Sequence, residues 1–344
     1  MAGFTDAWYQ GSAWLHLLRP LSALFRLLSR VRRKRLTALQ QPSAIPVIVV
    51  GNISVGGTGK TPVVIALADA LENSGWRVGV ISRGYGGTAK HYPLFVNSTT
   101  DVRESGDEAR LMRKYLRGPL VLDPQRSRAL QALIAQSDCD VVISDDGLQH
   151  YRMSRDIEIV VVDAARGIGN GLCLPAGPLR EPAQRLSEVD FVLINGQHPL
   201  QLPTVRTVPT RFTLEPHAWI NVRTGQQVSL SALALALGAS DEQAPVAIDV
   251  IAGIGNPERF FQTVRQLGFK VRARKFPDHH AYSKTDLAFA SQSVLLMTEK
   301  DAVKCQHFAS DNWWYLSVKA ALPTTFLQAV SKQLDGLDTA RKAG

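Results

Sequence analysis

The chain has 344 residues, enough for two domains that each bury a core of their own. Its 45% hydrophobic and 20% charged residues are typical of a folded globular protein, and its three widely spaced cysteines argue against a disulfide framework or a structural zinc site. So few cysteines also suit a reducing compartment. The net charge is +9, but seven basic residues against Asp6 alone lie within the first 35, which leaves +3 for the other 309. The basic character is therefore local, and a general nucleic-acid-binding surface is not expected.

The first predicted element is an amphipathic helix in residues 1–35. Apolar residues recur there in alternating steps of three and four, so that a helix would carry them as one stripe with arginines on the opposite side. The stripe consists of Trp14, Leu17, Leu21, Leu24, Leu28 and Val31, and the opposite side carries Arg19, Arg26, Arg30 and Arg33. This pattern is typical of a helix that lies in a membrane interface and is attracted to anionic lipid.

The same segment could in principle span a membrane, direct secretion or pack on the protein itself. A transmembrane span is excluded because Arg19 and Arg26 interrupt the apolar run, whereas about 18 uncharged residues are needed. A secretory signal is excluded because the positive cluster follows the apolar stretch instead of preceding it. The alternative that remains is a helix docked on the protein's own body. Pro20 is expected to start or kink the helix.

A strand, a glycine-rich loop and a helix are predicted between Pro46 and Leu71. Residues 47–50 form a β-branched, apolar run typical of a buried strand, and after the loop apolar residues return at helical spacing. The loop matches the phosphate-binding P-loop pattern except that Ser54 stands where the pattern has glycine. The candidate nucleotide-binding residues are Ser54, Val55, Gly56, Gly57, Thr58, Gly59, Lys60 and Thr61.

In a P-loop, successive backbone N–H groups point inward and bind phosphate oxygens. Lys60 would reach the β- and γ-phosphates, and the hydroxyl of Thr61 would hold Mg²⁺. The alternative is an ordinary strand-to-helix turn whose glycines serve close packing. The order of strand, Gly-Lys-Thr and helix favours a nucleoside triphosphate site.

Strands and helices alternate from this loop to Asn195, which predicts an α/β fold with a mostly parallel sheet covered by helices on both faces. Strands are expected at 77–82, 91–96, 120–122, 141–146, 157–163 and 191–195, and helices at 105–117 and 126–135. Asp107 and Glu108 fall in the first turn of the helix at 105–117. From the residues alone, the expected role of these two acids is charge complementarity with the helix start.

Two pairs of charged residues in this half are candidates for a site. Asp145 and Asp146 end an apolar strand beside the P-loop strand, where Mg²⁺–nucleotide chemistry requires a carboxylate, although paired acids are common in turns too. Arg180 and Glu181 lie in a long loop with little periodicity, and such loops in compact domains often carry function. Phosphate contact and metal support are their candidate roles, and a surface ion pair is the alternative.

The second half is expected to begin with a β-rich connection at 205–245, followed by a second α/β block. The turn at 253–258 resembles a dinucleotide-binding fingerprint but has a glutamate where the third glycine belongs, so that a tight strand-to-helix turn is predicted instead. Asp278, His279 and His280 could form a catalytic or metal cluster. A metal site would need more ligands than this local group supplies.

Several motifs in this order carry a family resemblance. Besides the basic amphipathic N-terminus they are Asn52–Pro62, Ser82–Tyr85, Gly106–Glu108, Asp145–His150, Pro178–Pro182, Phe276–His280 and Thr298–Asp301. Together they resemble the tetraacyldisaccharide 4′-kinases, or lipid A 4′-kinases, of Gram-negative bacteria over nearly the whole chain. The resemblance includes Ser54, which looks like the family's own variant of the P-loop.

The resemblance implies a P-loop NTPase-like fold and a division of the chain into four parts. These are a membrane-interface helix at 1–35, a nucleotide-binding kinase domain at 36–204, the β-rich connection at 205–245 and a smaller α/β domain at 246–344. It also implies an activity, the transfer of the γ-phosphoryl group of ATP to the 4′-hydroxyl of a membrane-embedded, tetraacylated glucosamine disaccharide 1-phosphate in lipid A biosynthesis.

The cofactors and partners follow from that activity. ATP and Mg²⁺ are the implied cofactors, and the acylated disaccharide lipid and an anionic inner-membrane surface are the implied partners. The protein would bind peripherally at the cytoplasmic face of the inner membrane, because its substrate cannot leave the bilayer. No nucleic acid is expected, and no obligate protein partner is evident.

The resemblance further implies roles at the nucleotide. Lys60 would neutralise the β- and γ-phosphates. Thr61, Asp145 and Asp146 would hold Mg²⁺, with Asp146 as the direct ligand and Glu181 as a supporting residue. The family chemistry agrees with the residues, because phosphoryl transfer needs positioning and charge neutralisation more than covalent help.

On the acceptor side, Asp107 is similar to the family's acid that accepts the proton of the sugar hydroxyl. It would be paired with His279, and a carboxylate oriented by an imidazole is a sound general base. The neighbouring His280 is the alternative partner. Gln149, His150 and Arg180 would line the cleft between the domains.

Two other functions are compatible with parts of the pattern. A membrane-positioning P-loop ATPase of the MinD or partition type also carries a Gly-Gly-x-Gly-Lys-Thr core. Such proteins have a signature lysine where this chain has Val55, and their membrane helix is typically C-terminal, so both features count against this alternative. In a soluble small-molecule kinase, the N-terminal stripe would only serve packing.

Overall fold

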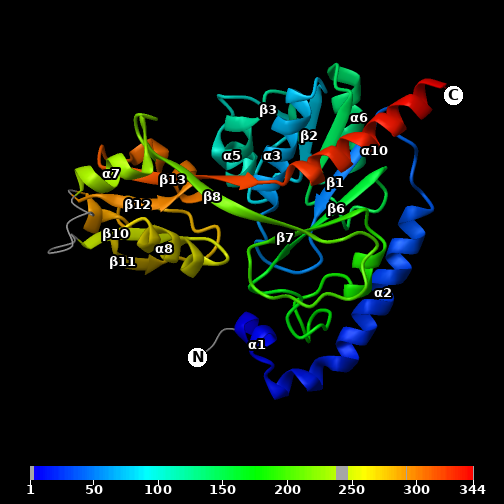
Figure 1. Cartoon of the computed structure of the whole chain (residues 1–344), viewed down its shortest axis with the longest axis horizontal. Coiled ribbons are helices and arrows are strands. Elements are labelled where there is room, and N and C mark those ends of the chain that lie inside the picture. Colours follow the sequence, from blue (N-terminus) through cyan, green and yellow to red (C-terminus); the bar gives the residue numbers. More distant parts are fainter. Residues whose placement is uncertain (1–3, 238–246, 292, 344) are drawn as a thin grey trace.

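The computed structural model describes residues 4–237, 247–291 and 293–343 (Figure 1). Within them the chain forms two α/β lobes, which are joined by a long antiparallel strand pair, β8 (Thr210–Asn221) and β13 (Trp313–Ala321). The larger lobe holds the P-loop, and the smaller lobe is built from residues after β8. The expected α/β architecture, with a mostly parallel sheet and a second, smaller block, is confirmed.

The sheet of the larger lobe has the order β3-β4-β2-β5-β1-β6-β7-β8. Its strands are β1 (Val47–Gly51), β2 (Val78–Ser82), β3 (Leu94–Val96), β4 (Leu120–Leu122), β5 (Val141–Asp145), β6 (Ile157–Asp163) and β7 (Phe191–Asn195). All these pairings are parallel except that of β3 with β4. The observed β3 is shorter than the strand expected at 91–96, and Pro93, which cannot donate to a ladder, directly precedes it.

Helices cover both faces of this sheet because β1 is apolar on both sides. Ile48 and Val50 pack with α3 (Lys60–Asn73) and α5 (Asp107–Tyr115), and Val47 and Val49 pack with α6 (Arg126–Gln136). Each of these four side chains is fully buried, and burial of such a side chain contributes roughly 1.5–3 kcal/mol. The short helices α4 (Val102–Ser105) and η2 (Ala183–Ser187) complete the lobe.

The smaller lobe continues the sheet in the order β8-β13-β12-β10-β11. Its further strands are β9 (Gln227–Val228), β10 (Ala247–Ala252), β11 (Lys270–Lys275) and β12 (Leu295–Thr298), and its helices are α7 (Leu230–Ala236), α8 (Pro257–Gln266), η3 (Ala288–Ala290), α9 (Glu299–Cys305) and η4 (Gln306–Phe308). The strand expected to start at 246 is observed from Ala247, and position 246 itself lies outside the described residues. Helix α7 was not predicted, since the pattern at 205–245 indicated strands only.

The two lobes share backbone hydrogen bonds through β8. The start of this strand, Thr210–Phe212, pairs in parallel with β7, and the rest pairs antiparallel with β13. After β13 the chain returns to the larger lobe, where α10 (Thr324–Ala343) buries Phe326, Val330 and Leu334 against its core. The last helix therefore packs with the larger lobe, and the division into 36–204, 205–245 and 246–344 stays a prediction.

The N-terminal segment contains three helices, α1 (Phe4–Gln10), η1 (Ala13–Leu18) and α2 (Arg19–Thr37), with Pro20 in the first turn of α2. Helix α2 lies along the larger lobe (Figure 1), and its contact face is mixed, because Phe25 packs against a core cluster of that lobe. On that face the hydroxyl of Ser22 donates to the carbonyl of Cys173 at 2.7 Å, and Arg33 pairs with Glu188 at 2.6 Å.

The apolar stripe of this segment does not pack on the body. Trp14, Leu17, Leu21, Leu24, Leu28 and Val31 are between 41% and 82% exposed. The alternative that the apolar stripe docks on the protein's own body is therefore wrong. A different face of the helix contacts the larger lobe. No helix among the described residues is long and apolar enough to cross a membrane.

The contrast between core and stripe gives a test of stability. Replacing the fully buried Leu67 of α3 with alanine should lower the free energy of unfolding by about 2–5 kcal/mol, because it leaves a cavity in the core. The matched control Leu24→Ala, at a position 52% exposed, should change it by less than about 0.5 kcal/mol. Urea unfolding of both variants measures the difference, and equal losses would contradict the assigned packing.

Candidate active site

The glycine-rich loop connects the end of β1 to the start of α3. Gly56 and Gly59 have φ angles of +96° and +93°, which residues with a side chain rarely adopt. A side chain at position 59 would also collide with Asn195, since its Cβ would lie 2.6 Å from the amide nitrogen. That amide donates a 3.0 Å hydrogen bond to the carbonyl of Thr58 and holds the loop in this shape. Backbone N–H groups in such a loop at a helix start can bind phosphate.

The first two residues of the loop are used for packing. Ser54 is buried and forms a β-bridge with Leu179, and the N–H of Val55 donates to the carbonyl of Pro178 at 2.9 Å. The part of the candidate stretch that faces the adjoining cavity is Gly56, Gly57, Thr58, Gly59, Lys60 and Thr61. The serine in the variant pattern therefore ties the loop to the segment before Arg180.

Lys60 and Arg180 both contact Asp146, which follows the end of β5. The ammonium of Lys60 lies 3.4 Å from one carboxylate oxygen of Asp146, and the Arg180 guanidinium lies 3.3 Å from the other. Asp146 itself has a φ of +47°, an uncommon conformation for a residue with a side chain. The backbone thus turns this carboxylate toward the two cations next to the P-loop.

The two adjacent aspartates have opposite environments. Burial raises the pKa of Asp145 to about 6, and the carboxylates of Glu108 and Asp146 contribute to the same rise. Burial alone would also raise the pKa of Asp146, but Lys60 and Arg180 outweigh it and lower that pKa to about 2. Asp146 is therefore ionised at neutral pH, and Asp145 holds its proton more tightly than an ordinary carboxyl group.

This pair fits a magnesium ion. One carboxylate oxygen of Asp145 accepts from the Ser82 hydroxyl at 3.0 Å, and the other is buried without a hydrogen-bond partner among the described residues. A cation beside this oxygen would offset the unfavourable negative charge. Mg²⁺ usually takes only one or two carboxylates and completes its shell with phosphate oxygens and water.

Glu181 lies in a different set of contacts. Its carboxylate accepts a 2.7 Å hydrogen bond from Gln149 and lies 3.3 Å from the guanidinium of Arg185. The Gln149 amide also donates to the carbonyl of Asn52, and its oxygen accepts a 3.4 Å hydrogen bond from the Arg180 guanidinium. In the described residues no group of three or more His, Cys, Asp or Glu side chains is arranged to hold a metal. The structure therefore does not bring Glu181 into one ligand cluster with Asp145 and Asp146.

His150 lines the same cavity and is uncharged at neutral pH. Its pKa is lowered to about 4, first by burial and then by the positive charges of Arg126 and Arg83. It can therefore accept or donate a hydrogen bond there without bringing a charge.

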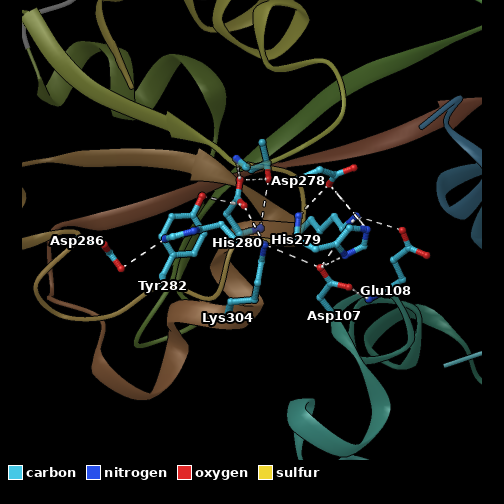
Figure 2. A network of polar contacts seen from close by, with 12 residues as sticks. Asp107, Glu108, Asp278, His279, His280, Tyr282, Asp286 and Lys304 are labelled. Carbon is cyan, nitrogen blue, oxygen red and sulfur yellow. Dashed lines mark hydrogen bonds and ion pairs between the residues drawn. The ribbon is translucent and has the colours of Figure 1, made fainter. Parts of the chain in front are cut away.

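The second part of the site is formed by residues from both lobes. Asp107, at the start of α5 in the larger lobe, has a carboxylate oxygen 3.2 Å from Nδ1 of His279 in the smaller lobe (Figure 2). His279 has a φ of +60°, and its ring packs edge-on against Tyr85 with the ring centres 4.9 Å apart. Nonglycine residues in this conformation are uncommon and cluster at functional sites.

His280 points into the smaller lobe instead. Its ring lies 4.9 Å from both Phe276 and Tyr282, and Nε2 faces Asp286 at 3.4 Å. Of the two adjacent histidines, it is His279 that meets Asp107, as the resemblance implied.

Both halves border one cavity of about 1650 Å³. Its lining includes Gly56–Thr61, the paired aspartates, Gln149, His150, Arg180, Glu108, His279 and Lys300. Phe25, Leu28, Ser29 and Arg32 of α2 form another part of the wall. Asp107, only 6% exposed, lies directly behind Glu108 and His279. The cavity therefore connects the P-loop, the Asp107–His279 pair and the N-terminal helix.

Some residues of this site had no assigned role in the sequence. Arg126 is almost completely buried and donates to the carbonyl of Asp145 at 3.2 Å, and burial lowers its pKa to about 10. Lys300 lies 3.1 Å from Glu108 and 3.2 Å from Nε2 of His279. Lys300 lies in the motif Thr298–Asp301, which contributed to the family resemblance and could have indicated a role for this lysine. Arg126 lies at the start of an ordinary amphipathic helix, and no motif pointed to it.

Comparisons with known proteins agree with this geometry. The sequence profile of the tetraacyldisaccharide-1-P 4′-kinase family matches residues 14–335. A tetraacyldisaccharide 4′-kinase of Pseudomonas putida W619 is 48% identical over 323 residues, covering 92% of this chain and 91% of its own length. One of Pseudomonas aeruginosa LESB58 is 46% identical over 336 residues, covering 96% of each chain.

A solved structure is similar as well. The crystal structure of LpxK from Aquifex aeolicus in complex with ATP superposes with a TM-score of 0.75 at 28% identity, and the match covers 93% of this chain and 99% of that one. These relationships extend over nearly the whole length and decide against the MinD-type alternative. The chain belongs to the tetraacyldisaccharide 4′-kinase family.

Proposed function

We propose that this protein is an ATP-dependent kinase that phosphorylates the 4′-hydroxyl of a tetraacylated glucosamine disaccharide 1-phosphate, a precursor of lipid A. The observation that carries the proposal is the single cavity in which a P-loop, a carboxylate–imidazole pair from two lobes and one face of an amphipathic helix meet. Family membership supplies the substrate class. ATP and Mg²⁺ are the cofactors of this reaction.

On the nucleotide side, Lys60 and the N–H groups of the glycine-rich loop bind and orient the phosphates. Mg²⁺ would be held by the Thr61 hydroxyl with Asp145 and Asp146, and when bound it would neutralise charge on the β- and γ-phosphates. Of the two aspartates, Asp146 is the better direct ligand because it is ionised at neutral pH. Arg180, which already contacts Asp146, adds positive charge at the same position.

On the acceptor side, the 4′-oxygen forms a bond to the γ-phosphorus while the bond from that phosphorus to the β,γ-bridging oxygen breaks, and ADP leaves. The Asp107–His279 pair takes the hydroxyl proton. Its location supports this role, because His279 lines the cavity and Asp107 fixes the imidazole from behind. Gln149 and His150 offer uncharged hydrogen-bonding groups to the sugar.

The helix α2 accounts for access to a lipid. Its outward stripe would lie in the anionic cytoplasmic face of the inner membrane as a peripheral anchor, and the exposed Arg19, Arg26 and Arg30 of the same helix would attract anionic headgroups. The same helix lines the cavity through Phe25 and Arg32. A headgroup can therefore enter the cavity while its acyl chains stay next to the bilayer.

The activity can be measured directly. We expect ATP-dependent phosphorylation of a tetraacylated disaccharide 1-phosphate in detergent micelles, with little ATP turnover when the lipid is omitted. The lipid requirement follows because the acceptor hydroxyl is part of the reaction. Radiolabel transfer from [γ-³²P]ATP measures the first quantity and ADP release the second. Rapid ATP hydrolysis without lipid, and no labelled lipid, would contradict the proposal.

The proton-accepting pair can be tested by comparing His279 with its neighbour His280. Asp107→Ala and His279→Ala should lower kcat by about 10²–10⁴-fold, because each removes part of the proton-accepting pair, while nucleotide affinity stays within about twofold. His280→Ala is the matched control and should retain most of its turnover, since that ring faces Asp286. Steady-state kinetics and equilibrium nucleotide binding separate the two effects. Unchanged kcat in Asp107→Ala would remove Asp107 from this role.

Membrane binding can be tested without deleting α1, whose residues pack against the body. The double variant Leu21→Ser/Leu24→Ser should bind anionic liposomes at least tenfold more weakly, because it removes apolar area from the exposed stripe. The control Val208→Ser/Leu235→Ser changes exposed apolar residues elsewhere. Sedimentation with liposomes measures both, and equal binding of the two double variants would refute the anchor.

A further inference from the structure

A buried lysine lies directly behind the proposed proton-accepting pair. Lys304 follows one turn after Lys300 on α9, and its side chain is only 11% exposed. Its ammonium lies 3.3 Å from a carboxylate oxygen of Asp301 and 3.8 Å from one of Asp107 (Figure 2). A buried ammonium is unfavourable unless it is paired with negative charge. The two carboxylates differ in how much they depend on this cation.

Asp301 is already bonded without it. One of its oxygens accepts from the Thr298 hydroxyl at 2.6 Å and from the N–H of Gly253 at 3.1 Å, and the other accepts from the Tyr282 hydroxyl at 3.1 Å. This fully buried carboxylate is therefore fixed by three donors of its own lobe. It can act as a counter-ion that holds the Lys304 ammonium in place.

Asp107 is in the opposite situation. One of its oxygens accepts from the N–H of Glu108 at 2.9 Å. The other, which faces His279 and both lysines, has no hydrogen-bond partner of good geometry among the described residues, and neither does the ammonium of Lys304. The carboxylate is thus stabilised there mainly by charge at short range.

We infer that Lys304 is a positioning residue for the acceptor pair: held by Asp301, its ammonium keeps the Asp107 carboxylate turned toward Nδ1 of His279. This inference rests on the proposed function of that pair. Lys304 does not line the cavity, so it acts through Asp107 and not on the substrate.

Lys300 cannot replace it, because its charge is shared. Its ammonium lies 3.1 Å from Glu108, 3.5 Å from Asp278 and 4.0 Å from Asp107. The groups that face Asp107 are thus Glu108 from its own helix, Asp278 and His279 from the adjoining loop, and Lys300 and Lys304 from α9. Without Lys304, the carboxylates near Asp107 would outnumber the cations, and Asp107 would bind a proton at higher pH.

A second lysine provides a matched control. Lys114, near the other end of α5, pairs with Glu299 at 2.8 Å and also joins the two lobes through α5 and α9. Its ammonium also donates to the Tyr315 hydroxyl at 2.6 Å, and it lies about two helical turns from Asp107. Lys114→Met removes an ion pair between the lobes without changing the charge next to Asp107. It therefore shows how much activity is lost when only a contact between the lobes is removed.

The experiment measures kcat against pH for the full chain with saturating MgATP and the micellar lipid. In Lys304→Met the acidic limb of the profile should move up by about one pH unit, which lowers kcat about tenfold on that limb, while KM for ATP changes less than about twofold. Lys304→Arg should restore most of the profile, and Lys114→Met should leave its midpoint in place. An unmoved limb in Lys304→Met, or a uniform loss at all pH values equal to that of Lys114→Met, would overturn the inference.

A second readout does not depend on turnover. The titration of the His279 imidazole, followed by ¹³Cε1 NMR and assigned with His279→Ala, should shift to higher pH in Lys304→Met and in Lys304→Gln but not in Lys114→Met. Two neutral variants, Lys304→Met and Lys304→Gln, are used so that the test can still be made if one of them fails to fold. If the wild-type protein phosphorylated no lipid but this shift occurred, the proposed function would fail and the positioning role would stand. No shift in either neutral variant would refute the positioning role.

Discussion

The contact between Asp107 and His279 depends on how the two lobes are held together. Strand β8 is a member of both halves of the sheet, because its first residues pair with β7 and the rest pair with β13. Backbone ladders allow little change of register without losing hydrogen bonds. Helix α10 then returns to the larger lobe and buries three apolar side chains there. The position of the loop that carries His279 is therefore set from both ends of the smaller lobe.

The charges of the site illustrate the cost of assembling acids around a phosphate-transfer centre. A pKa of about 6 for the buried Asp145, against 3.8 for the free side chain, means that folding opposes its ionisation. Because the folded-state pKa is raised, this cost is absent below pH 3.8, grows between pH 3.8 and 6, and reaches about 3 kcal/mol above pH 6. A bound divalent cation would offset most of it. The apparent defect in stability is thus consistent with a preorganised metal site.

The sequence predicted those parts of the site that depend on local pattern. The P-loop lies between a strand and a helix, Asp145 ends β5 with Asp146 directly after it, and Asp107 starts α5, because each position is fixed by a few neighbouring residues. The fold class followed from the alternation of apolar runs. The contact face of α2 could not be predicted, because it mixes the polar Ser22 with Phe25, whereas the leucines that give the stronger hydrophobic signal face outward.

Sequence pattern also could not distinguish between neighbouring residues of the same type. His279 and His280 are indistinguishable by composition, and only the left-handed backbone at His279 turns one ring to Asp107 and the other into the core of the smaller lobe. Buried charges such as Lys304 and Arg126 could not be predicted either, since a charged residue on a short helix is ordinarily expected in solvent. Their partners come from distant parts of the chain, so that only the folded structure identifies them as paired.

The N-terminal helix connects an exposed apolar surface with the cavity. A stripe of large apolar side chains in contact with water is unfavourable and is found on soluble surfaces mainly where something covers it. Another face of α2 is already occupied by the larger lobe, through Ser22, Phe25 and Arg33, so the stripe is left for an external surface. The exposed arginines on other sides of the same helix favour a surface that is anionic. Because Leu28 belongs to the exposed stripe and also lines the cavity wall, the exposed apolar stripe and the cavity are continuous. If the stripe lies in a bilayer, as proposed, a lipid headgroup reaches the P-loop without its acyl chains crossing water, and the unfavourable exposure of apolar chains to water is avoided.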